Sequence, residues 1–368
     1  MRDALAERLF GSVMGIAPED EDLLIRTVRP LQRMAIYKFD GYGGYGPGIK
    51  FLETLAMWLG QFDPDERTVA LDFVKNELIF LSDREIQHSL SLAYQDFVRP
   101  ALMREASTEL GIDPWRVAQI LQSASFKVRQ RRTLFMGMAD GARLDQFRRA
   151  NQELVHDQFS VTAEPPDRVA LTMRDDLKAW LARQELAADA TFNRFVLIDD
   201  FSGSGFTALR QDGDTGVWGG KLHHVRMHLE SLKQLGVATP EIVVQVLLYT
   251  ASEVARDGLR ESVAKAGLEW KVDVVQLIPN KSRVDPDSEF AKICRKYHDS
   301  YVDDEVKIGA SSKSSALGFR DSRLPLVLSH NTPNNSVGIL WENTSAESES
   351  ERRFTPLFPR HERHKADR

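Results

Sequence analysis

Short, uninterrupted apolar runs alternate with amphipathic stretches through the middle of the chain. The apolar runs cover residues 133–139, 195–198, 243–248 and 272–277. Runs of this length without a polar face are typical of strands in a parallel sheet that helices cover on both sides. Between and after the later runs, apolar residues recur at helical spacing, which favours βαβ units. We therefore predict an α/β fold in which the last three runs are neighbouring parallel strands of one sheet.

The first part of the chain has a different pattern, with apolar stripes at helical spacing. Residues 21–36 and 49–61 both place their apolar side chains along one side of a helix. From residue 345 the composition changes to a stretch rich in Ser, Glu and Arg. These shifts predict a helical N-terminal region over residues 1–130, a parallel-sheet domain over residues 131–344 and a polar, charged C-terminal tail over residues 345–368.

A glycine-rich segment, residues 40–48, separates two of the predicted helices. Glycine and proline at this density do not continue a helix. One interpretation is a mobile loop over a ligand, with Tyr42 and Tyr45 available to stack on a base. The other interpretation, which we favour slightly, is a flexible connector between helices.

Composition limits the remaining function classes. The chain has 368 residues, a formal net charge of −6 and a hydrophobic fraction of 42%, so its bulk charge gives no sign of nucleic-acid binding. A basic stretch over residues 116–132 is compatible with a nucleic-acid surface, but in an acidic chain it is more often a solvated face or an internal partner of phosphate. The single cysteine, Cys294, excludes a disulfide framework and a multi-cysteine zinc site.

The sequence gives no sign of a targeting or membrane-spanning segment. No apolar run approaches the roughly 20 residues that a membrane-spanning helix needs. The first residues carry acids and lack the apolar core of a signal peptide. We therefore expect a cytoplasmic protein without membrane contact, and a single cysteine fits a reducing compartment.

The predicted strand at residues 195–198 leads into the most informative stretch of the chain. It ends in two adjacent carboxylates, Asp199 and Asp200, and a Ser-Gly-Ser-Gly loop follows. Acids at the carboxyl end of a strand accept hydrogen bonds from ribose hydroxyls or hold Mg²⁺ through its waters. Glycines let backbone N–H groups approach an anion such as phosphate. Two acids and two glycines are also compatible with an ordinary turn, but the full pattern predicts a pocket for a phosphorylated ribose, with solvent-facing carboxylates.

The order of apolar strand, two acids, small-residue loop and threonine resembles the phosphoribosyl pyrophosphate (PRPP) motif of type I phosphoribosyltransferases. The resemblance implies that Asp199 and Asp200 are the catalytic and metal-associated residues and hold the ribose hydroxyls. It also implies that the loop cradles the 5′-phosphate. The implied loop residues are Ser202, Gly203, Ser204, Gly205, Phe206 and Thr207. Phe206 departs from the family pattern, which has no bulky residue at that place.

The family fold has a pyrophosphate-binding loop after its first core strand. By resemblance, this loop is the turn that follows the run at 133–139. Its residues are Asp140, Gly141, Ala142 and Arg143. A tight turn between strand and helix exposes backbone N–H groups, and a guanidinium adds a fork of donors for phosphate oxygens. The resemblance further implies a flexible loop that closes over the site, expected within residues 163–176 with Arg168 and Arg174 as its cations.

A second polar segment follows the apolar run at residues 324–328. Its amides, hydroxyls and imidazole suit the hydrogen-bonding groups of a base or ribose, although Asn, Pro and Ser also form ordinary turns. The expected base or acceptor pocket consists of His330, Asn331, Asn334 and Asn335. Together with residues 318–322 and Trp341, this segment resembles a divergent phosphoribosyltransferase-like family found in bacterial conflict and defence systems. The similarity extends from the loop near Tyr42 to residue 360 and so covers most of the chain.

The resemblance implies a parallel-sheet type I phosphoribosyltransferase-like core with a helical N-terminal region. The implied function is binding of PRPP or a related nucleotide with Mg²⁺ and transfer of phosphoribose to a base or other acceptor, alongside protein partners encoded in the same defence system. The alternative is a non-catalytic nucleotide or phosphoribosyl sensor, or a partner-binding module. A third hypothesis, a nucleic-acid modifier, depends on residues 116–132 alone.

Overall fold

The computed structural model describes residues 2–206, 208–213, 215–301, 315–342 and 354–360. The chain divides into two compact units. The first unit takes in residues 1–85 and 280–368, and the second unit residues 86–279. The chain leaves the first unit within α5 (Asp83–Leu92) and returns to it after β8 (Lys271–Ile278). The boundary expected at residue 130 instead marks the change from helices to strands inside the second unit.

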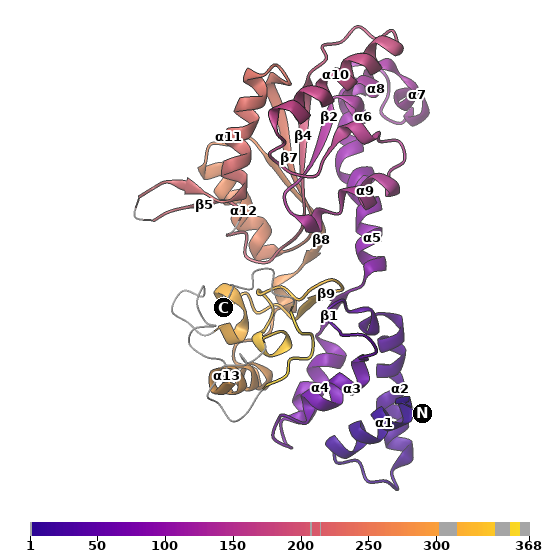
Figure 1. Cartoon of the computed structure of the whole chain (residues 1–368), viewed down its shortest axis with the longest axis vertical. Coiled ribbons are helices and arrows are strands. Elements are labelled where there is room, and N and C mark those ends of the chain that lie inside the picture. The colour runs from indigo at the N-terminus through magenta and orange to yellow at the C-terminus, as the bar shows by residue number, and fades with distance from the viewer. Residues whose placement is uncertain (1, 207, 214, 302–314, 343–353, 361–368) are drawn as a thin grey trace. The chain divides into compact units, whose positions relative to one another are not determined.

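The second unit is built on a five-stranded sheet in which every pair of neighbouring strands is parallel (Figure 1). In spatial order the strands are β3 (Phe159–Ser160), β2 (Thr133–Gly137), β4 (Phe192–Ser202), β7 (Ala238–Ser252) and β8. The three runs predicted as neighbouring parallel strands lie in β4, β7 and β8, so that prediction is confirmed. β4 is the central strand, with two strands on either side.

Helices cover both faces of this sheet. One face packs against α10 (Asp167–Arg183), α11 (Lys221–Gln234) and α12 (Glu253–Lys265). The other face is covered by α5, the π-helical turn η2 (Ala93–Val98), α6 (Arg99–Leu110), α7 (Val117–Gln122), α8 (Ala124–Arg131) and α9 (Leu144–Ala150). Part of the predicted helical N-terminal region is therefore one of the two helical layers of the α/β unit.

The alternation of side chains along β4 decides where its acids point. Phe195 and Leu197 belong to the core under α10–α12, whereas Val196 and Ile198 belong to the core on the opposite face. Successive residues of a strand face opposite sides of a sheet. The strand geometry therefore directs Asp199 toward the α11 and α12 face and Asp200 toward the α9 face.

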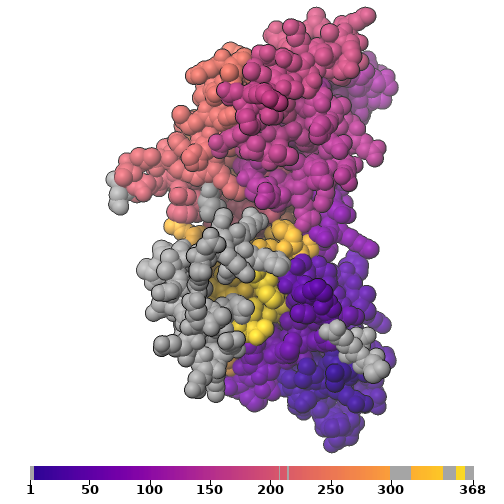
Figure 2. Space-filling model, in the orientation of Figure 1, coloured from indigo at the N-terminus to yellow at the C-terminus, as the bar shows by residue number. Residues whose placement is uncertain are grey.

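A short hairpin follows the Ser-Gly-Ser-Gly loop and precedes α11. Its strands are β5 (Arg210–Gln211) and β6 (Trp218–Gly219), which pair antiparallel. Figures 1 and 2 show that the hairpin projects from the body of the second unit, whose remaining elements pack into a continuous mass.

The first unit is mainly helical around a two-stranded parallel sheet. Its strands are β1 (Ile79–Leu81) and β9 (Leu326–Leu328), which come from distant parts of the chain. Its helices are α1 (Arg2–Val13), α2 (Glu21–Tyr37), α3 (Phe51–Leu59), α4 (Arg67–Asn76) and α13 (Glu289–Tyr301). Cys294 is buried in the core of this unit, which raises the pKa of its thiol well above the ordinary value and fits a packing role.

The glycine-rich segment at residues 40–48 is a packed loop of the first unit. Tyr42 is 2% exposed, its hydroxyl lies 2.9 Å from Oγ1 of Thr332 and it donates to the carbonyl of Pro359 at 2.7 Å. Tyr45 donates to the carbonyl of Leu357 at 3.0 Å. Neither ring is available to stack on a base, so that interpretation is wrong. The segment does connect α2 to α3, but its contacts hold it in place.

Part of the predicted polar tail also belongs to this core. Phe354, Leu357 and Phe358 are buried, and the ring of Phe358 lies 5.2 Å from that of Tyr42. Apolar side chains at these positions stabilise the unit because they are removed from water. A composition that is polar on average concealed these anchoring residues.

Candidate functional site

The candidate site lies at the carboxyl edge of the five-stranded sheet in the second unit. It consists of the end of β4, the loop at residues 202–206 and the short 3₁₀ turn η3 (Asp140–Ala142), which follows β2. In parallel sheets, ligands bind outside the carboxyl ends of the strands. The segments that were predicted to bind phosphate and pyrophosphate are thus carried by adjacent strands.

Asp199 is buried, with 7% of its surface exposed, and the expectation that it faces solvent is wrong. Its Oδ1 accepts the backbone N–H of Asp200 at 3.1 Å, and its Oδ2 accepts a hydrogen bond from Nζ of Lys221 at 2.9 Å. Burial and the neighbouring carboxylate of Asp200 raise the pKa of Asp199 to about 6, while Lys221 opposes that shift. The ion pair therefore compensates a charge that burial makes costly.

Asp200 is half-buried and points to the other face of the sheet. Its Oδ1 accepts the backbone N–H of Phe201 at 2.9 Å. A Cβ atom at position 141 would overlap the carboxylate of Asp200, so only glycine lets η3 approach the acid this closely. This contact places the η3 turn beside the end of β4.

The loop at residues 202–206 is held by the start of α12. The carbonyl of Gly203 accepts the hydroxyl of Ser252 at 2.7 Å, and Ser252 also caps α12 through the N–H of Ala255 at 2.9 Å. Gly205 has a φ of 72°, and a Cβ there would lie 2.8 Å from the carbonyl oxygen of Ala255. Both facts require glycine at this position.

The backbone of this loop keeps donors available. Within the described part of the chain, the N–H groups of Gly203, Ser204 and Gly205 donate no hydrogen bond. A cluster of such groups forms a concave site for an anion. Thr207, the last residue of the predicted phosphate loop, lies outside the described residues.

Phe206 marks the departure from the family pattern. Its side chain is half-buried, and the guanidinium of Arg210 lies 5.4 Å from its ring centroid. A cation at this distance is attracted by the face of an aromatic ring. Phe206 therefore links the phosphate loop to the first strand of the projecting hairpin.

Tyr249 holds the turn that was predicted to bind pyrophosphate. The hydroxyl of Tyr249 donates to the carbonyl of Ala142 at 2.7 Å. Burial, then Asp200 and Asp199, raise the pKa of Tyr249 well above its ordinary value, and Arg143 acts in the opposite direction. Both acids and Arg143 thus lie close enough to Tyr249 to influence the pKa of its hydroxyl. Arg143 itself has a φ of 46°, an uncommon conformation for a residue with a side chain.

The flexible loop expected within residues 163–176 takes a different form. From Asp167 onward this segment is the first half of α10, which packs on the sheet through Ala170 and Met173. Arg168 and Arg174 therefore lie on a helix, and Arg174 pairs with Asp175 at 2.9 Å. Residues 167–176 of the expected loop are therefore helical.

The residues expected to form a base or acceptor pocket belong to the first unit, not to the unit that carries the acids. Asn335 is 7% exposed and its amide donates to the hydroxyl of Ser322 at 2.9 Å. The carbonyl of Asn334 accepts the N–H of Phe319 at 2.7 Å, and Oδ1 of Asn331 accepts the N–H of Thr332 at 3.0 Å. His330 is half-buried beside them. These bonds stabilise the loop itself, and its ability to bind a base stays a prediction.

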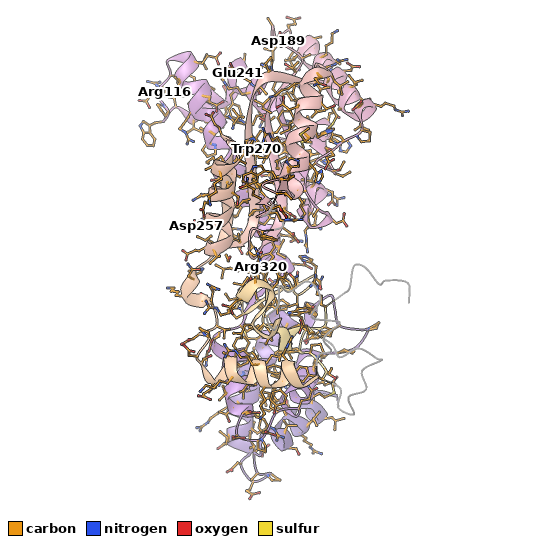
Figure 3. The ribbon with its side chains drawn as sticks, turned by 90° about the vertical axis from the view of Figure 1, so that its left-hand side faces the viewer. Arg116, Asp189, Glu241, Asp257, Trp270 and Arg320 are labelled. Atoms are coloured by element: carbon orange, nitrogen blue, oxygen red, sulfur yellow. The ribbon has the colours of Figure 1, made fainter. Side chains whose placement is uncertain are left out.

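The basic stretch at residues 116–132 is partly neutralised by internal partners. Arg129 pairs with Glu109 at 2.5 Å, and the buried Arg131 pairs with Asp157 at 3.1 Å. Arg116 is exposed at the edge of the second unit (Figure 3). Two of the four arginines of the stretch are thus paired with acids, which weakens the case for a nucleic-acid surface.

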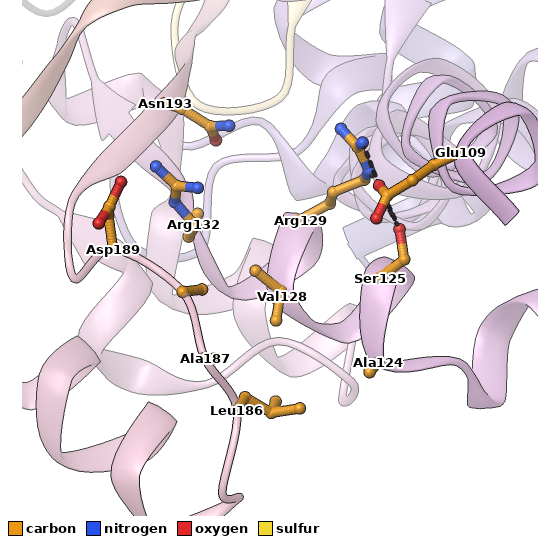
Figure 4. Close-up of a pocket in the computed structure, with 11 residues that line it drawn as sticks. Glu109, Ala124, Ser125, Val128, Arg129, Arg132, Leu186, Ala187, Asp189 and Asn193 are labelled. Atoms are coloured by element: carbon orange, nitrogen blue, oxygen red, sulfur yellow. Dashed lines mark hydrogen bonds and ion pairs between the residues drawn. The ribbon is translucent and has the colours of Figure 1, made fainter.

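A cavity of about 820 Å³ lies beside this stretch, at the amino-terminal edge of the sheet and therefore opposite the candidate site. Figure 4 shows the ion pair between Arg129 and Glu109 on one wall and Arg132 between Asp189 and Asn193 on the other. Arg132 donates to the carbonyl of Thr191 at 2.7 Å. Arg129 and Arg132, which line this cavity, thus already form hydrogen bonds or ion pairs within the protein.

The described residues contain no group of three or more His, Cys, Asp or Glu side chains arranged to hold a metal ion. Mg²⁺, however, is commonly bound by one or two carboxylates together with phosphates of the ligand. Asp199 and Asp200 fit a magnesium ion of that kind. Asp200 is half-buried and therefore more accessible than the buried Asp199.

Sequence reasoning missed the residues that hold this site in shape. Lys221 begins α11, Tyr249 ends a buried strand run, and Ser252 caps α12. Ser252 carried a usable signal, since serine before an amphipathic stretch is a typical helix cap. Lys221 and Tyr249 carried none, because their roles depend on contacts across strands that sequence spacing does not reveal.

Comparisons with known proteins give one match. The family model PRTase-CE matches residues 55–360, which is well over half of the chain. No curated protein matches the chain, and neither does any solved structure. Among the described helices, none combines the length and apolar character that crossing a membrane requires.

Proposed function

The chain belongs to the PRTase-CE family, and we propose that its second unit binds PRPP or a related phosphorylated ribose. The family supports a phosphoribosyltransferase-like function in general. The observation that carries the specific proposal is the loop at residues 202–206, where three backbone N–H groups have no acceptor within the described chain, directly beyond two acids. Donors for an anion next to acceptors for hydroxyls suit a sugar phosphate.

In this proposal the two sides of the site bind different parts of the ligand. The N–H groups of Gly203, Ser204 and Gly205 donate to the 5′-phosphate. The half-buried Asp200 accepts from the ribose hydroxyls, and the η3 turn with Arg143 binds pyrophosphate beside it. Mg²⁺, held by Asp200 and Asp199 together with the ligand, would neutralise the charge of the pyrophosphate group.

Transfer, if it occurs, breaks the bond between ribose C1 and the pyrophosphate oxygen and forms a bond from C1 to an acceptor. Positive charge develops on the ribose while negative charge grows on pyrophosphate. The chain's own residues contribute by holding the sugar phosphate in place and by placing Asp200 and Arg143 near the developing charges. The proposal includes no nucleophile from the protein.

A second candidate function is binding without turnover, as a sensor or partner-binding module. The observation that favours it is α10, which fills the stretch where a mobile closing loop was expected. A site without such a loop leaves the reacting atoms exposed to water. In this candidate function the site binds the same ligand but does not catalyse phosphoribosyl transfer.

One experiment separates these functions. The purified chain is titrated with PRPP in the presence of Mg²⁺ by calorimetry, and is then incubated with PRPP and a panel of bases and nucleotides while pyrophosphate is measured. Binding with pyrophosphate release supports the transferase, and binding without release supports the sensor. No binding of PRPP or any nucleotide contradicts both. The Asp199→Asn, Asp200→Asn double variant is the control and is expected to bind at least about tenfold more weakly.

A role in bacterial defence is proposed on the sequence resemblance alone. Cells that express the chain with its neighbouring genes are challenged with phage, and the same cells carry Asp200→Asn as the comparison. Protection that depends on Asp200 supports a ligand-dependent defence role. Equal plating with and without the genes contradicts it.

A further inference from the structure

Lys221 is placed where helix formation alone gives no reason for a lysine. It is the first residue of α11, a helix of 14 residues. The N-terminus of a helix carries partial positive charge, so a cation there is electrostatically unfavourable. The nearby Asp199 supplies the compensation, with 2.9 Å between Nζ and Oδ2.

The two partners of this ion pair differ in exposure. The side chain of Asp199 is 9% exposed, whereas that of Lys221 is 44% exposed. An ammonium group has three donors, and in the described part of the chain its hydrogen-bond acceptor is Asp199. Asp199 therefore anchors the lysine from the protein interior, and the half-exposed ammonium group has further donors for a ligand.

The first turn of α11 also lies against the phosphate loop. The N–H of Leu222 donates to the carbonyl of Ala208 at 2.9 Å, just after the loop at residues 202–206. Lys221 is thus fixed at two points, through its side chain on β4 and through its neighbour's backbone at the loop. Both contacts hold the first turn of α11 close to the end of β4 and to the residues that follow the loop.

We propose that Lys221 is a phosphate-binding residue of this site and that Asp199 positions it. The proposal rests on the proposed function and divides the two acids by role. Asp200 faces the ligand hydroxyls, whereas Asp199 holds the cation that donates to a phosphate oxygen. A charge-assisted hydrogen bond from an ammonium to phosphate is among the stronger contacts that a site offers.

The test measures affinity for ribose 5-phosphate by calorimetry in the presence of EDTA, so that no metal ion contributes. Lys221→Met keeps the length of the side chain and removes its charge, and is expected to weaken binding by about tenfold or more. Lys221→Arg keeps the charge and is expected to retain most of the affinity. Lys233→Met, at the last turn of the same helix, where Lys233 pairs with Glu230 at 2.9 Å, is the control and is expected to bind like the wild type.

Lys221→Met leaves the buried carboxylate of Asp199 without its ion-pair partner, which could destabilise the fold. A second variant therefore separates a loss of binding from a loss of structure. Lys221→Met, Asp199→Asn removes both charges and is expected to show the same loss of affinity with a normal unfolding transition. Wild-type affinity in either variant overturns the proposal.

Inorganic pyrophosphate is the second probe. If the wild type binds pyrophosphate in a Lys221-dependent way but does not bind ribose 5-phosphate, the role of Lys221 stands and the phosphoribosyl function fails. If the wild type binds neither probe, both fail.

Discussion

Two glycine-rich loops, one in each unit, show that composition alone does not identify a binding loop. Residues 40–48 and residues 202–206 both combine glycines with an aromatic residue. In the first loop, the tyrosine hydroxyls and the N–H of Gly43 bond to carbonyls or hydroxyls of the same unit. In the second loop, the N–H groups of Gly203, Ser204 and Gly205 have no acceptor in the described chain. The N–H groups of Gly44, Gly46 and Gly48 also have no acceptor in the described chain. The difference is that tyrosine hydroxyls and Gly43 anchor the first loop, whereas the second loop leaves three consecutive backbone donors that can converge on one anion.

The largest expected effect concerns the loop at residues 40–48. Tyr42→Ala removes a buried ring and its hydrogen bonds to Thr332 and Pro359, and should lower the free energy of unfolding by about 3–5 kcal/mol. Urea denaturation followed by circular dichroism measures this. Tyr37→Ala, whose side chain is 67% exposed, is the matched control and should cost less than about 0.5 kcal/mol. A small loss for Tyr42→Ala would mean that the loop is not held by its tyrosine.

In the loop at residues 202–206, a change of backbone conformation should reduce both stability and ligand binding. Gly205→Ala forces a side chain into a left-handed conformation and against the carbonyl of Ala255, and should cost about 2 kcal/mol of stability and abolish ligand binding. Gly219→Ala in β6, where a Cβ meets nothing within 4 Å, is the control. Unfolding and calorimetry on both variants check this, and wild-type binding by Gly205→Ala would exclude the loop as the anion site.

A smaller effect is expected from the acid on the ligand side. Asp200→Asn keeps the size of the side chain and removes its charge, and should weaken binding of PRPP with Mg²⁺ by about tenfold, which is ~1.4 kcal/mol. Asp257→Asn, on the exposed side of α12 (Figure 3), should bind like the wild type. Equal affinities for Asp200→Asn and the wild type would remove Asp200 from the site.

The smallest effect is a pH dependence of stability. The pKa of Asp199 is about 6 in the folded chain, against 3.8 as its ordinary value, so the folded state binds this proton more tightly than the unfolded state. Stability should therefore fall as the pH rises from about 4 to 6, by on the order of 1 kcal/mol or more. Urea titrations at pH 4, 5 and 6 measure the slope. Asp199→Asn should flatten it, and an unchanged slope in this variant would assign the effect to another group.

The sequence predicted the sheet well because its strands carry their own signal. Uninterrupted apolar runs at 195–198, 243–248 and 272–277 are what a strand covered on both faces requires. The sequence also singled out the two turns that follow β2 and β4, and parallel strands bring their carboxyl ends to one edge of the sheet. The ligand-binding role of these turns stays a prediction. What the sequence missed depended on contacts across the chain, such as Lys221 with Asp199 and Tyr42 with Pro359.

The two adjacent acids illustrate the limit most clearly. In the sequence Asp199 and Asp200 look like an equivalent pair. The alternation of side chains along β4 sends them to opposite faces, one against Lys221 and the other against Gly141. The alternation of side chains could be predicted from the sequence, but the contacts of Asp199 with Lys221 and of Asp200 with Gly141 could not.

The central claim is that the backbone N–H groups of residues 203–205 bind the ligand, and the most direct test is to observe these groups while a ligand binds. The chain is labelled with ¹⁵N-glycine and ¹⁵N-serine, and amide resonances are followed by NMR during titration with PRPP. The account predicts that the resonances of Gly203, Ser204 and Gly205 shift with a common affinity, while that of Gly43, whose N–H already donates to the carbonyl of Ser329 at 2.7 Å, stays in place. Saturation by PRPP without a shift of the three loop resonances would contradict it.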